Sequence, residues 1–155
     1  MQHGSDIRIR PGAMSDIDAL IALERNVFAA NCMSRKSLRR FLSVPTATVL
    51  IAEHGKMVAG CAVLLMHAST PAMARLYSIA VAPANEGHGI GPMLLHSCEE
   101  AARQHGRAQI RLEVHEQNQR AIGLYRKEGY AEFGRHVGYY KDLGDALRFR
   151  KELAA

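Results

Sequence analysis

Hydrophobic residues along this chain follow two spacings, and each spacing predicts a type of secondary structure. Where apolar residues alternate with polar ones or form short runs, the pattern is typical of β-strands. Where they recur at every third or fourth position, the pattern is typical of amphipathic helices. Strands are predicted at residues 7–10, 48–53, 57–66, 74–81, 110–114, 130–137 and 145–151, and helices at residues 16–28, 34–42, 93–105 and 121–128.

Polar residues and glycines between these segments predict where the elements begin and end. Ser15 is placed to cap the first helix, and Gly106 and Gly129 are placed to end the third and the fourth. The short polar stretch at residues 54–56 separates two strand patterns, which indicates a hairpin turn.

The order of the elements predicts the fold class. It reads β-α-α-β-β-β-α-β-α-β-β, so an antiparallel meander leads into a strand, helix, strand crossover. This order is typical of an α/β fold of the mixed α+β kind, with a largely antiparallel sheet of about six to seven strands flanked by about four helices. No repeat or linker interrupts residues 7–153, and we expect residues 1–155 to form a single domain.

Composition narrows the possible classes of protein. Apolar residues make up 48% of the chain and charged residues 23%, as in soluble globular proteins. No apolar run approaches the roughly 18 residues of a membrane span, and residues 1–10 lack the apolar centre of a signal peptide. We therefore expect a cytoplasmic protein with no membrane partner. Cys32, Cys61 and Cys98 lie far apart without a CxxC pair, so we expect reduced thiols and no metal site.

The formal net charge of +5 favours an anionic partner. A phosphorylated cofactor, an acidic peptide and a nucleic acid all fit this charge. The absence of Trp, an aromatic content of 6% and the absence of a nucleic-acid-binding motif argue against a nucleic acid.

The segment NEGHGIGP, residues 85–92, places three glycines at every second position between a predicted strand and a predicted helix. It does not fit the P-loop pattern, and Pro92 stands where the dinucleotide pattern GxGxxG requires its last glycine. Uncovered backbone N–H groups at a helix N-terminus attract anions. The segment therefore indicates either a binding site for a pyrophosphate group or a glycine-rich turn that holds no ligand.

Two segments in this order, LYSIAVAPANEGHGIGPMLL and LEVHEQNQRAIGLYRKEGY, resemble the signature of the GCN5-related N-acetyltransferase (GNAT) superfamily. Within it the chain is most similar to the bacterial ribosomal-protein alanine N-acetyltransferases, most strongly over residues 75–140. The resemblance implies a GNAT-like fold, N-acetyltransferase activity and acetyl-CoA as co-substrate. It assigns the pyrophosphate contact to Gly87, His88, Gly89, Ile90, Gly91 and Pro92. One position departs from the pattern, because Glu86 stands where Gln or Arg is usual, and a carboxylate is unfavourable beside a pyrophosphate.

The resemblance also assigns the contacts of the pantetheine arm of acetyl-CoA. It implies that the main chain of Ile79, Ala80 and Val81 pairs with this arm and directs an N–H group to the thioester oxygen. It places Asn118 on the same arm, although an asparagine at this position is also an ordinary helix cap.

Two residues have the chemistry of a general base and a general acid. Strand alternation places Glu113 on one face with His115, and by resemblance Glu113 is the general base; the alternative is a strand carboxylate paired with an arginine. Tyr125 matches the general acid of the superfamily, since a phenol can protonate a departing thiolate; the alternative is a packing residue. His115 is either an accessory base or a passive surface residue.

The acceptor is an amine whose identity the sequence indicates only in part. An α-amino group has a pKa of about 8 and a lysine one of about 10.4, so more of the α-amino group is neutral at pH 7. This difference and the resemblance favour the N-terminus of a protein or peptide. Tyr139 and Tyr140 lie where the ribosomal-protein group presents aromatic residues to its peptide, or else pack in a hairpin. The alternatives are a small-molecule amine (polyamine, amino acid or aminoglycoside) and a non-catalytic acyl-CoA-binding sensor, and the oligomeric state stays undetermined.

Overall fold

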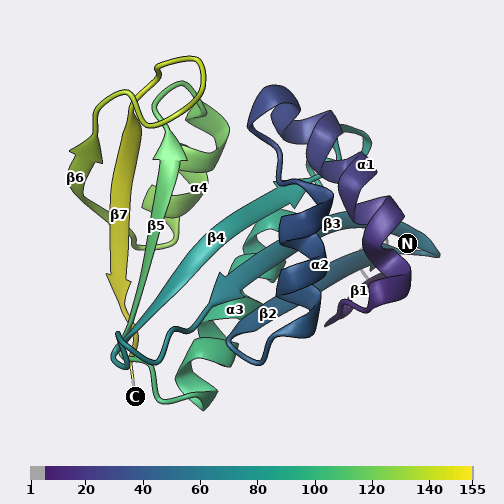
Figure 1. The fold of residues 1–155 in the computed structure, drawn as a ribbon, viewed down its shortest axis with the longest axis horizontal. Helices are drawn as coiled ribbons and strands as arrows, with labels where there is room; N and C mark the ends of the chain where they lie inside the picture. Colours follow the sequence, from purple (N-terminus) through teal and green to yellow (C-terminus); the bar gives the residue numbers. More distant parts are fainter. Residues whose placement is uncertain (1–5, 155) are drawn as a thin grey trace.

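Seven strands form one sheet in the order β1-β2-β3-β4-β5-β7-β6, and Figure 1 shows helices on both of its faces. The computed structural model describes residues 6–154. The strands are β1 (Ile7–Pro11), β2 (Ala47–His54), β3 (Met57–Leu65), β4 (Met73–Val81), β5 (Gln109–His115), β6 (Ala131–His136) and β7 (Ala146–Glu152). The helices are α1 (Ile17–Phe28), α2 (Arg35–Ser43), α3 (Ile90–Gln104) and α4 (Gln119–Lys127), with short 3-10 helices at Met14–Asp16, Ala29–Asn31 and Pro83–Asn85. Every predicted strand and helix is present in the predicted order, which confirms the predicted mixed fold.

Helices α1, α3 and α4 begin elsewhere than the sequence predicts, α4 at Gln119, two residues before its predicted start. A 3-10 turn precedes α1, and the residue that flanks α1 is Asp16, so the prediction that Ser15 caps this helix is wrong. The Asp16 carboxylate accepts hydrogen bonds from the Arg10 guanidinium and from the backbone N–H of Ala13, which fixes the turn. Helix α3 begins at Ile90, before the apolar pattern that starts at residue 93, and has Pro92 in its first turn, where the missing N–H group would have no partner within the helix.

The parallel pair of β4 and β5 opens the sheet near its middle. The two strands pair only between Met73–Leu76 on β4 and Gln109–Leu112 on β5. Directly after Leu76, Tyr77 is an extra residue in the pairing of β4 with β3, and such bulges are common next to active sites. Beyond this point the two strands diverge, as Figure 1 shows. The divergence leaves the second half of β4 without a strand partner on its β5 side.

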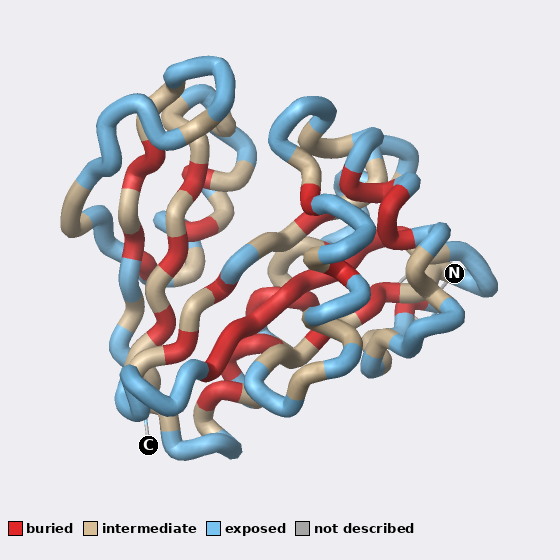
Figure 2. The backbone as a smooth tube through the Cα atoms, in the orientation of Figure 1, coloured by how far each residue is buried: buried red, intermediate tan, exposed pale blue. Residues whose placement is uncertain are grey.

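Two hydrophobic cores cover the two faces of the sheet. Helices α1 and α2 pack buried residues such as Leu20 and Leu38 against Ile51 of β2. Helices α3 and α4 cover the opposite face, where Leu94 joins the same core as Phe149 of β7. Figure 2 shows the buried residues along the central strands and on the sides of the helices that face them. Within residues 6–154, no helix has the length and the apolar character needed to cross a membrane.

Candidate functional site

Two cavities meet where β4 and β5 diverge. The first, which we call the glycine cleft, is lined by the end of β4, the glycine segment and α4, including Val81, Gly89 and Arg120. The second, the carboxylate pocket, is lined by α1, β4, β5 and the loop between β6 and β7, including Glu24 and Glu113. Six residues line both cavities: Phe28, Asn31, Ile79, His115, Asn118 and Ala121. The two cavities therefore form one continuous cleft through the opening of the sheet.

The glycine segment presents bare backbone to the glycine cleft. Gly89, directly before α3, has φ 76° and ψ 16°, a left-handed conformation that favours glycine. A Cβ atom added at Gly87 or Gly89 would meet no atom within 4 Å, so open space adjoins the main chain there. Helix α3 is 15 residues long, and the N–H groups of its first turn have no partner within the helix. Free N–H donors at the positive end of a helix dipole fit a pyrophosphate group.

Most of the residues expected to contact pyrophosphate lie along this cleft. Gly87, Gly89, Ile90, Gly91 and Pro92 line it. His88 does not line it, because the His88 ring lies beside the ring of His54, with the ring centroids 5.4 Å apart. The His88 side chain is therefore placed apart from the other residues of the segment.

The three β4 residues expected at the pantetheine arm point in alternating directions. Ile79 and Val81 line the glycine cleft. Ala80 is 2% exposed and packs in the core beneath α1 and α2, so only its main chain is available to a ligand. Ile79 and Val81 therefore border the cleft, and the Ala80 side chain does not.

Asn118 caps α4 and also borders both cavities. Its Oδ1 atom accepts a hydrogen bond from the backbone N–H of Ala121 at 3.2 Å. Its Nδ2 atom makes no hydrogen bond within the described part of the chain, and the residue lines both cavities. Asn118 therefore caps α4 through Oδ1, and its Nδ2 atom is available to donate a hydrogen bond to a ligand.

The Glu86 carboxylate is paired with an arginine across the glycine cleft. Arg120 Nη1 of α4 lies 3.4 Å from Glu86 Oε1, and both residues line the cleft. Lys127, also on α4, is a second cation on the same wall. The ion pair offsets the negative charge of Glu86 near the glycines. It also engages the Arg120 guanidinium, which could otherwise bind an anionic ligand.

Glu113 lies in the carboxylate pocket and is held by arginines on both sides. Its Oε1 atom accepts a hydrogen bond from Arg75 Nε at 3.0 Å and lies 2.8 Å from Arg75 Nη2 in an ion pair. Its Oε2 atom lies 3.7 Å from Arg148 Nε, which is buried and has no hydrogen-bond partner among the described residues. The arginine pairing that the sequence left as an alternative is therefore present. It fixes the orientation of the carboxylate and leaves Oε2 as the less occupied oxygen.

Tyr125 of α4 lines the same pocket. Its ring packs against Tyr130 and Phe149, with ring centroids 5.8 Å and 6.3 Å away, and the residue is only 4% exposed. Burial raises the pKa of the Tyr125 phenol well above its usual value of 10. The hydroxyl therefore keeps its proton at neutral pH and makes no hydrogen bond within residues 6–154. A proton-bearing hydroxyl beside a cavity can serve as a proton donor.

Sequence reasoning missed Glu24, a carboxyl group of α1 in the wall of the carboxylate pocket. It is 1% exposed and accepts hydrogen bonds from the Met33 backbone N–H at 2.9 Å and the Ser78 hydroxyl at 3.0 Å. Burial raises the pKa of Glu24 above its usual value. The sequence could have indicated this burial, because Glu24 lies at helical spacing between Leu20 and Phe28 on the apolar face of α1.

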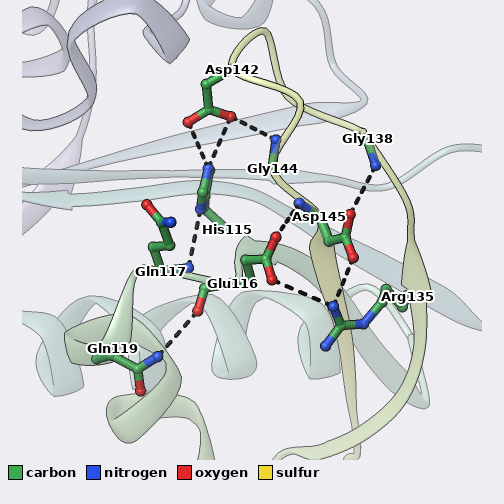
Figure 3. Close-up of polar contacts among 9 residues, drawn as sticks. All are labelled: His115, Glu116, Gln117, Gln119, Arg135, Gly138, Asp142, Gly144 and Asp145. Carbon is green, nitrogen blue, oxygen red and sulfur yellow. Dashed lines mark hydrogen bonds and ion pairs between the residues drawn. The ribbon is translucent and has the colours of Figure 1, made fainter.

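His115 uses both of its ring nitrogens in contacts within the protein (Figure 3). Nε2 lies 2.9 Å from Asp142 Oδ2, and Nδ1 accepts a hydrogen bond from the Gln117 backbone N–H at 3.1 Å. Because Nδ1 is an acceptor, this network assigns the proton to Nε2. Gly144 makes the arrangement possible, because a Cβ atom there would collide with His115 Nε2. His115 therefore holds the loop between β6 and β7 and has no free nitrogen for service as an accessory base.

Further polar contacts fix the same loop (Figure 3). The Asp145 carboxylate accepts hydrogen bonds from Arg135 Nη1 at 2.7 Å and from the Gly138 backbone N–H at 3.0 Å. The backbone N–H of Asp145 donates to Glu116 at 2.7 Å. Hydrogen bonds to Arg135 and Gly138 hold the pKa of Asp145 below its usual range, so it stays ionised.

This loop brings both predicted substrate tyrosines to the carboxylate pocket. The Tyr139 hydroxyl accepts a hydrogen bond from Arg75 at 3.2 Å. Tyr140 stacks on His115 with the ring centroids 4.8 Å apart. The two tyrosines therefore form a wall of the pocket next to Glu113, and they also pack within the loop as the alternative interpretation expected.

The two buried cysteines do not have the properties of reactive thiols. All three are free, and Cys61 and Cys98 are buried. Burial raises the pKa of Cys98 to about 12 and that of Cys61 further, so neither is a thiolate at neutral pH. Residues 6–154 contain no group of three or more His, Cys, Asp or Glu side chains that could hold a metal ion.

The chain matches a known protein family and has a relative of known sequence along most of its length. Residues 17–130 match the family model described as the acetyltransferase (GNAT) family. A Bacillus subtilis protein, assigned as a candidate alanine N-acetyltransferase of ribosomal protein bS18, is 29% identical over 141 residues. That alignment covers 90% of this chain and 91% of the relative.

Solved structures share the fold. The ribosomal-protein-S18-alanine N-acetyltransferase from Escherichia coli superposes with a TM-score of 0.85 at 24% identity, over 96% of this chain and 95% of that chain. A chain of the NatC complex bound to Gag peptide and CoA superposes with a TM-score of 0.83 at 22% identity, over 96% of this chain and 99% of that chain. At these identities the similarity establishes the fold.

Proposed function

The chain belongs to the acetyltransferase (GNAT) family, and we propose that it transfers an acetyl group from acetyl-CoA to the N-terminal α-amino group of a protein or peptide. One observation carries this proposal. The glycine cleft, which suits an anion, is continuous with a pocket that presents a carboxylate and a phenol. A donor and an acceptor that enter from the two sides would meet at the opening between β4 and β5.

The glycine cleft fits acetyl-CoA, which supplies the acetyl thioester when bound. The uncovered main chain at Gly87–Gly91 and the N-terminus of α3 would hold the pyrophosphate. The free edge of β4 beyond Leu76 would pair with the pantetheine arm, and Asn118, which lines the same cleft, would donate a further hydrogen bond from Nδ2. N–H groups on this edge would stabilise the charge that develops on the thioester oxygen.

The carboxylate pocket would receive the acceptor amine. In this proposal Glu113 Oε2 takes one proton from the attacking amine, directly or through a water, while Arg75 holds Oε1 in place. The Tyr125 hydroxyl, which belongs to the lining of the same pocket, gives its proton to the thiolate that leaves. An α-amino group suits a single carboxylate base better than a lysine does, because its pKa of about 8 leaves a larger neutral fraction at pH 7.

The named relatives support the same acceptor class. The Bacillus subtilis relative and the Escherichia coli structure carry the names of ribosomal-protein alanine N-acetyltransferases, and the NatC structure contains a peptide and CoA. These names support a terminal amine as acceptor and a CoA thioester as donor.

Release of CoA from acetyl-CoA, measured against one plate of amines, tests the proposal. The plate holds peptides with free N-termini, N-blocked peptides that contain lysine, polyamines, amino acids and aminoglycosides. The expected result is turnover with free N-terminal peptides and none with N-blocked ones. Turnover only with a polyamine, an amino acid or an aminoglycoside would replace the proposed acceptor with a small molecule. Acetyl-CoA binding without turnover on any amine would favour a non-catalytic sensor.

A further inference from the structure

Four arginines lie on one face of the sheet beside the carboxylate pocket. This arginine surface consists of Arg75 on β4, Arg111 on β5, and Arg148 and Arg150 on β7. The strand register places Arg75 beside Arg111, and Arg111 beside Arg150, so these three form a row across three adjacent strands. Helix α4 belongs to the core on the other face of these strands, where Phe149 is buried. The arginine row therefore faces away from that core.

Three of these guanidinium groups surround a single aromatic ring. Their central carbons lie 4.6 Å (Arg148), 5.0 Å (Arg111) and 5.0 Å (Arg150) from the centroid of the half-buried Phe133 ring on β6. Each cation is attracted to the ring, but the three cations repel one another at this spacing. An anion that contacts these guanidinium groups would offset that repulsion.

The protein supplies too few carboxylates for this surface. Glu113 is shared between Arg75 and Arg148. Within residues 6–154, neither Arg111 nor Arg150 is ion-paired with a carboxylate. Glu152 lies on the same face at the end of β7, but it accepts a hydrogen bond from Gln109. Two guanidinium groups are therefore held in a fixed row without an acidic partner.

The arginine surface is continuous with the proposed acceptor pocket. A third cavity, lined by Met73, Arg75, Arg111, Glu113, His136, Tyr139 and Arg148, shares three of these residues with the carboxylate pocket. Arg111 precedes Glu113 by two residues on β5, which corresponds to about 7 Å, the length of about two residues of extended peptide. A chain whose terminal amine lies at Glu113 can therefore place its second or third residue at Arg111.

We propose that the arginine surface selects acceptors whose residues directly after the terminal amine are acidic. The inference rests on the proposed function, since it assigns this surface to the part of the acceptor beyond the reacting amine. Planar guanidinium groups bind carboxylates through paired hydrogen bonds, and a row of them suits successive Asp or Glu side chains. The same row repels Lys and Arg, so it selects against basic acceptors as well as for acidic ones.

Three peptides that differ only after their first residue test the inference. Each begins with the same free N-terminal alanine, followed by Glu-Asp-Glu, Gln-Asn-Gln or Lys-Arg-Lys, and kcat/KM for acetylation is measured at low and high salt. We expect kcat/KM for the acidic peptide to exceed that for the neutral peptide by roughly threefold to tenfold, and the basic peptide to have the lowest kcat/KM. The difference is modest because exposed charge pairs contribute little binding free energy. Added salt should reduce these differences.

Two variants that change the charge by the same amount test whether the arginine surface causes the preference for acidic peptides. Arg150→Glu should lower kcat/KM for the acidic peptide and raise it for the basic peptide, a gain that a merely misfolded variant cannot produce. Arg39→Glu, on the exposed side of α2 and outside all three cavities, should leave the order of the peptides unchanged. Arg111→Gln should narrow the difference between the acidic and neutral peptides.

The outcomes separate this inference from the proposed function. Equal rates for the three peptides, or a faster basic peptide, would overturn the acidic preference while the acetyltransferase proposal stands. Acetyl-CoA binding with no acetylation of any peptide would contradict the proposed function instead. If wild type shows no acidic preference and Arg150→Glu loses affinity for a single-stranded RNA oligonucleotide, the surface binds nucleic acid and the inference is wrong.

Discussion

Replacing Gly89 with valine tests whether the main chain of the glycine segment is approached directly by a ligand. Gly89 has φ 76°, and a residue with a Cβ atom pays about 1–2 kcal/mol to adopt a left-handed conformation. The space around the added side chain is open, so the free protein should fold with a loss of stability of about that size. In the complex, the side chain would occupy the approach to the N–H groups. Loss of one hydrogen bond to a charged group costs about 1.5–3 kcal/mol, which raises the Kd for acetyl-CoA by roughly tenfold or more.

Gly106→Val is the matched control. Gly106 has φ 73°, its added Cβ also meets no atom within 4 Å, and it follows the opposite end of α3, a helix about 22 Å long. Both variants should lose similar stability in urea unfolding, because the backbone cost is the same. Only Gly89→Val should lose affinity in a calorimetric titration with acetyl-CoA. Wild-type affinity in Gly89→Val, or an equal loss in Gly106→Val, would refute the reasoning.

Three other substitutions have distinct expected results. Tyr125→Phe keeps the packed ring but removes the hydroxyl, so kcat should fall by roughly 10²-fold or more with little change in the Kd for acetyl-CoA; an unchanged kcat in steady-state assays would exclude the acid role. Glu86→Gln releases Arg120 from its ion pair and should strengthen acetyl-CoA binding several-fold at low salt in titration; weaker binding would show that the pair organises the cleft. Burial raises the pKa of Glu24, so the folded state holds that proton more tightly than the unfolded chain, and this contribution to stability is lost as the pH rises above the usual value of 4.5. Glu24→Gln should therefore flatten the fall in the free energy of unfolding as the pH rises above 4.5, and an unchanged pH dependence would contradict the assignment.

The sequence predicted the fold well because local patterns determine most of its elements. Alternation identified the strands, and Gly106 and Gly129 marked two helix ends where the backbone has positive φ. The start of α1 was mispredicted, because the Asp16 side chain is held by Arg10 of β1 and Ser15 lies in a 3-10 turn. Spacing along the chain does not reveal contacts of this kind.

The sequence predicted which residues could carry the chemistry of the candidate site, but not which side chains pair with them. Glu113 and Tyr125 follow from strand alternation and from the resemblance, and both line the carboxylate pocket. The ion pair of Glu113 with Arg75 joins residues 38 positions apart, and it depends on the register of β4 and β5. The burial of Glu24 likewise depends on how α1 lies on the sheet, so a sequence pattern could flag the residue but could not place it in the pocket wall.

The most direct test of the central claim is the position of the acetyl group on a single product. A peptide with a free N-terminal alanine and one internal lysine is incubated with the enzyme and acetyl-CoA, and tandem mass spectrometry locates the modification. The account predicts one acetyl group on the terminal α-amine and an unmodified lysine, because the α-amine has the larger neutral fraction for a single carboxylate base. Acetylation of the lysine with a free N-terminus would contradict it.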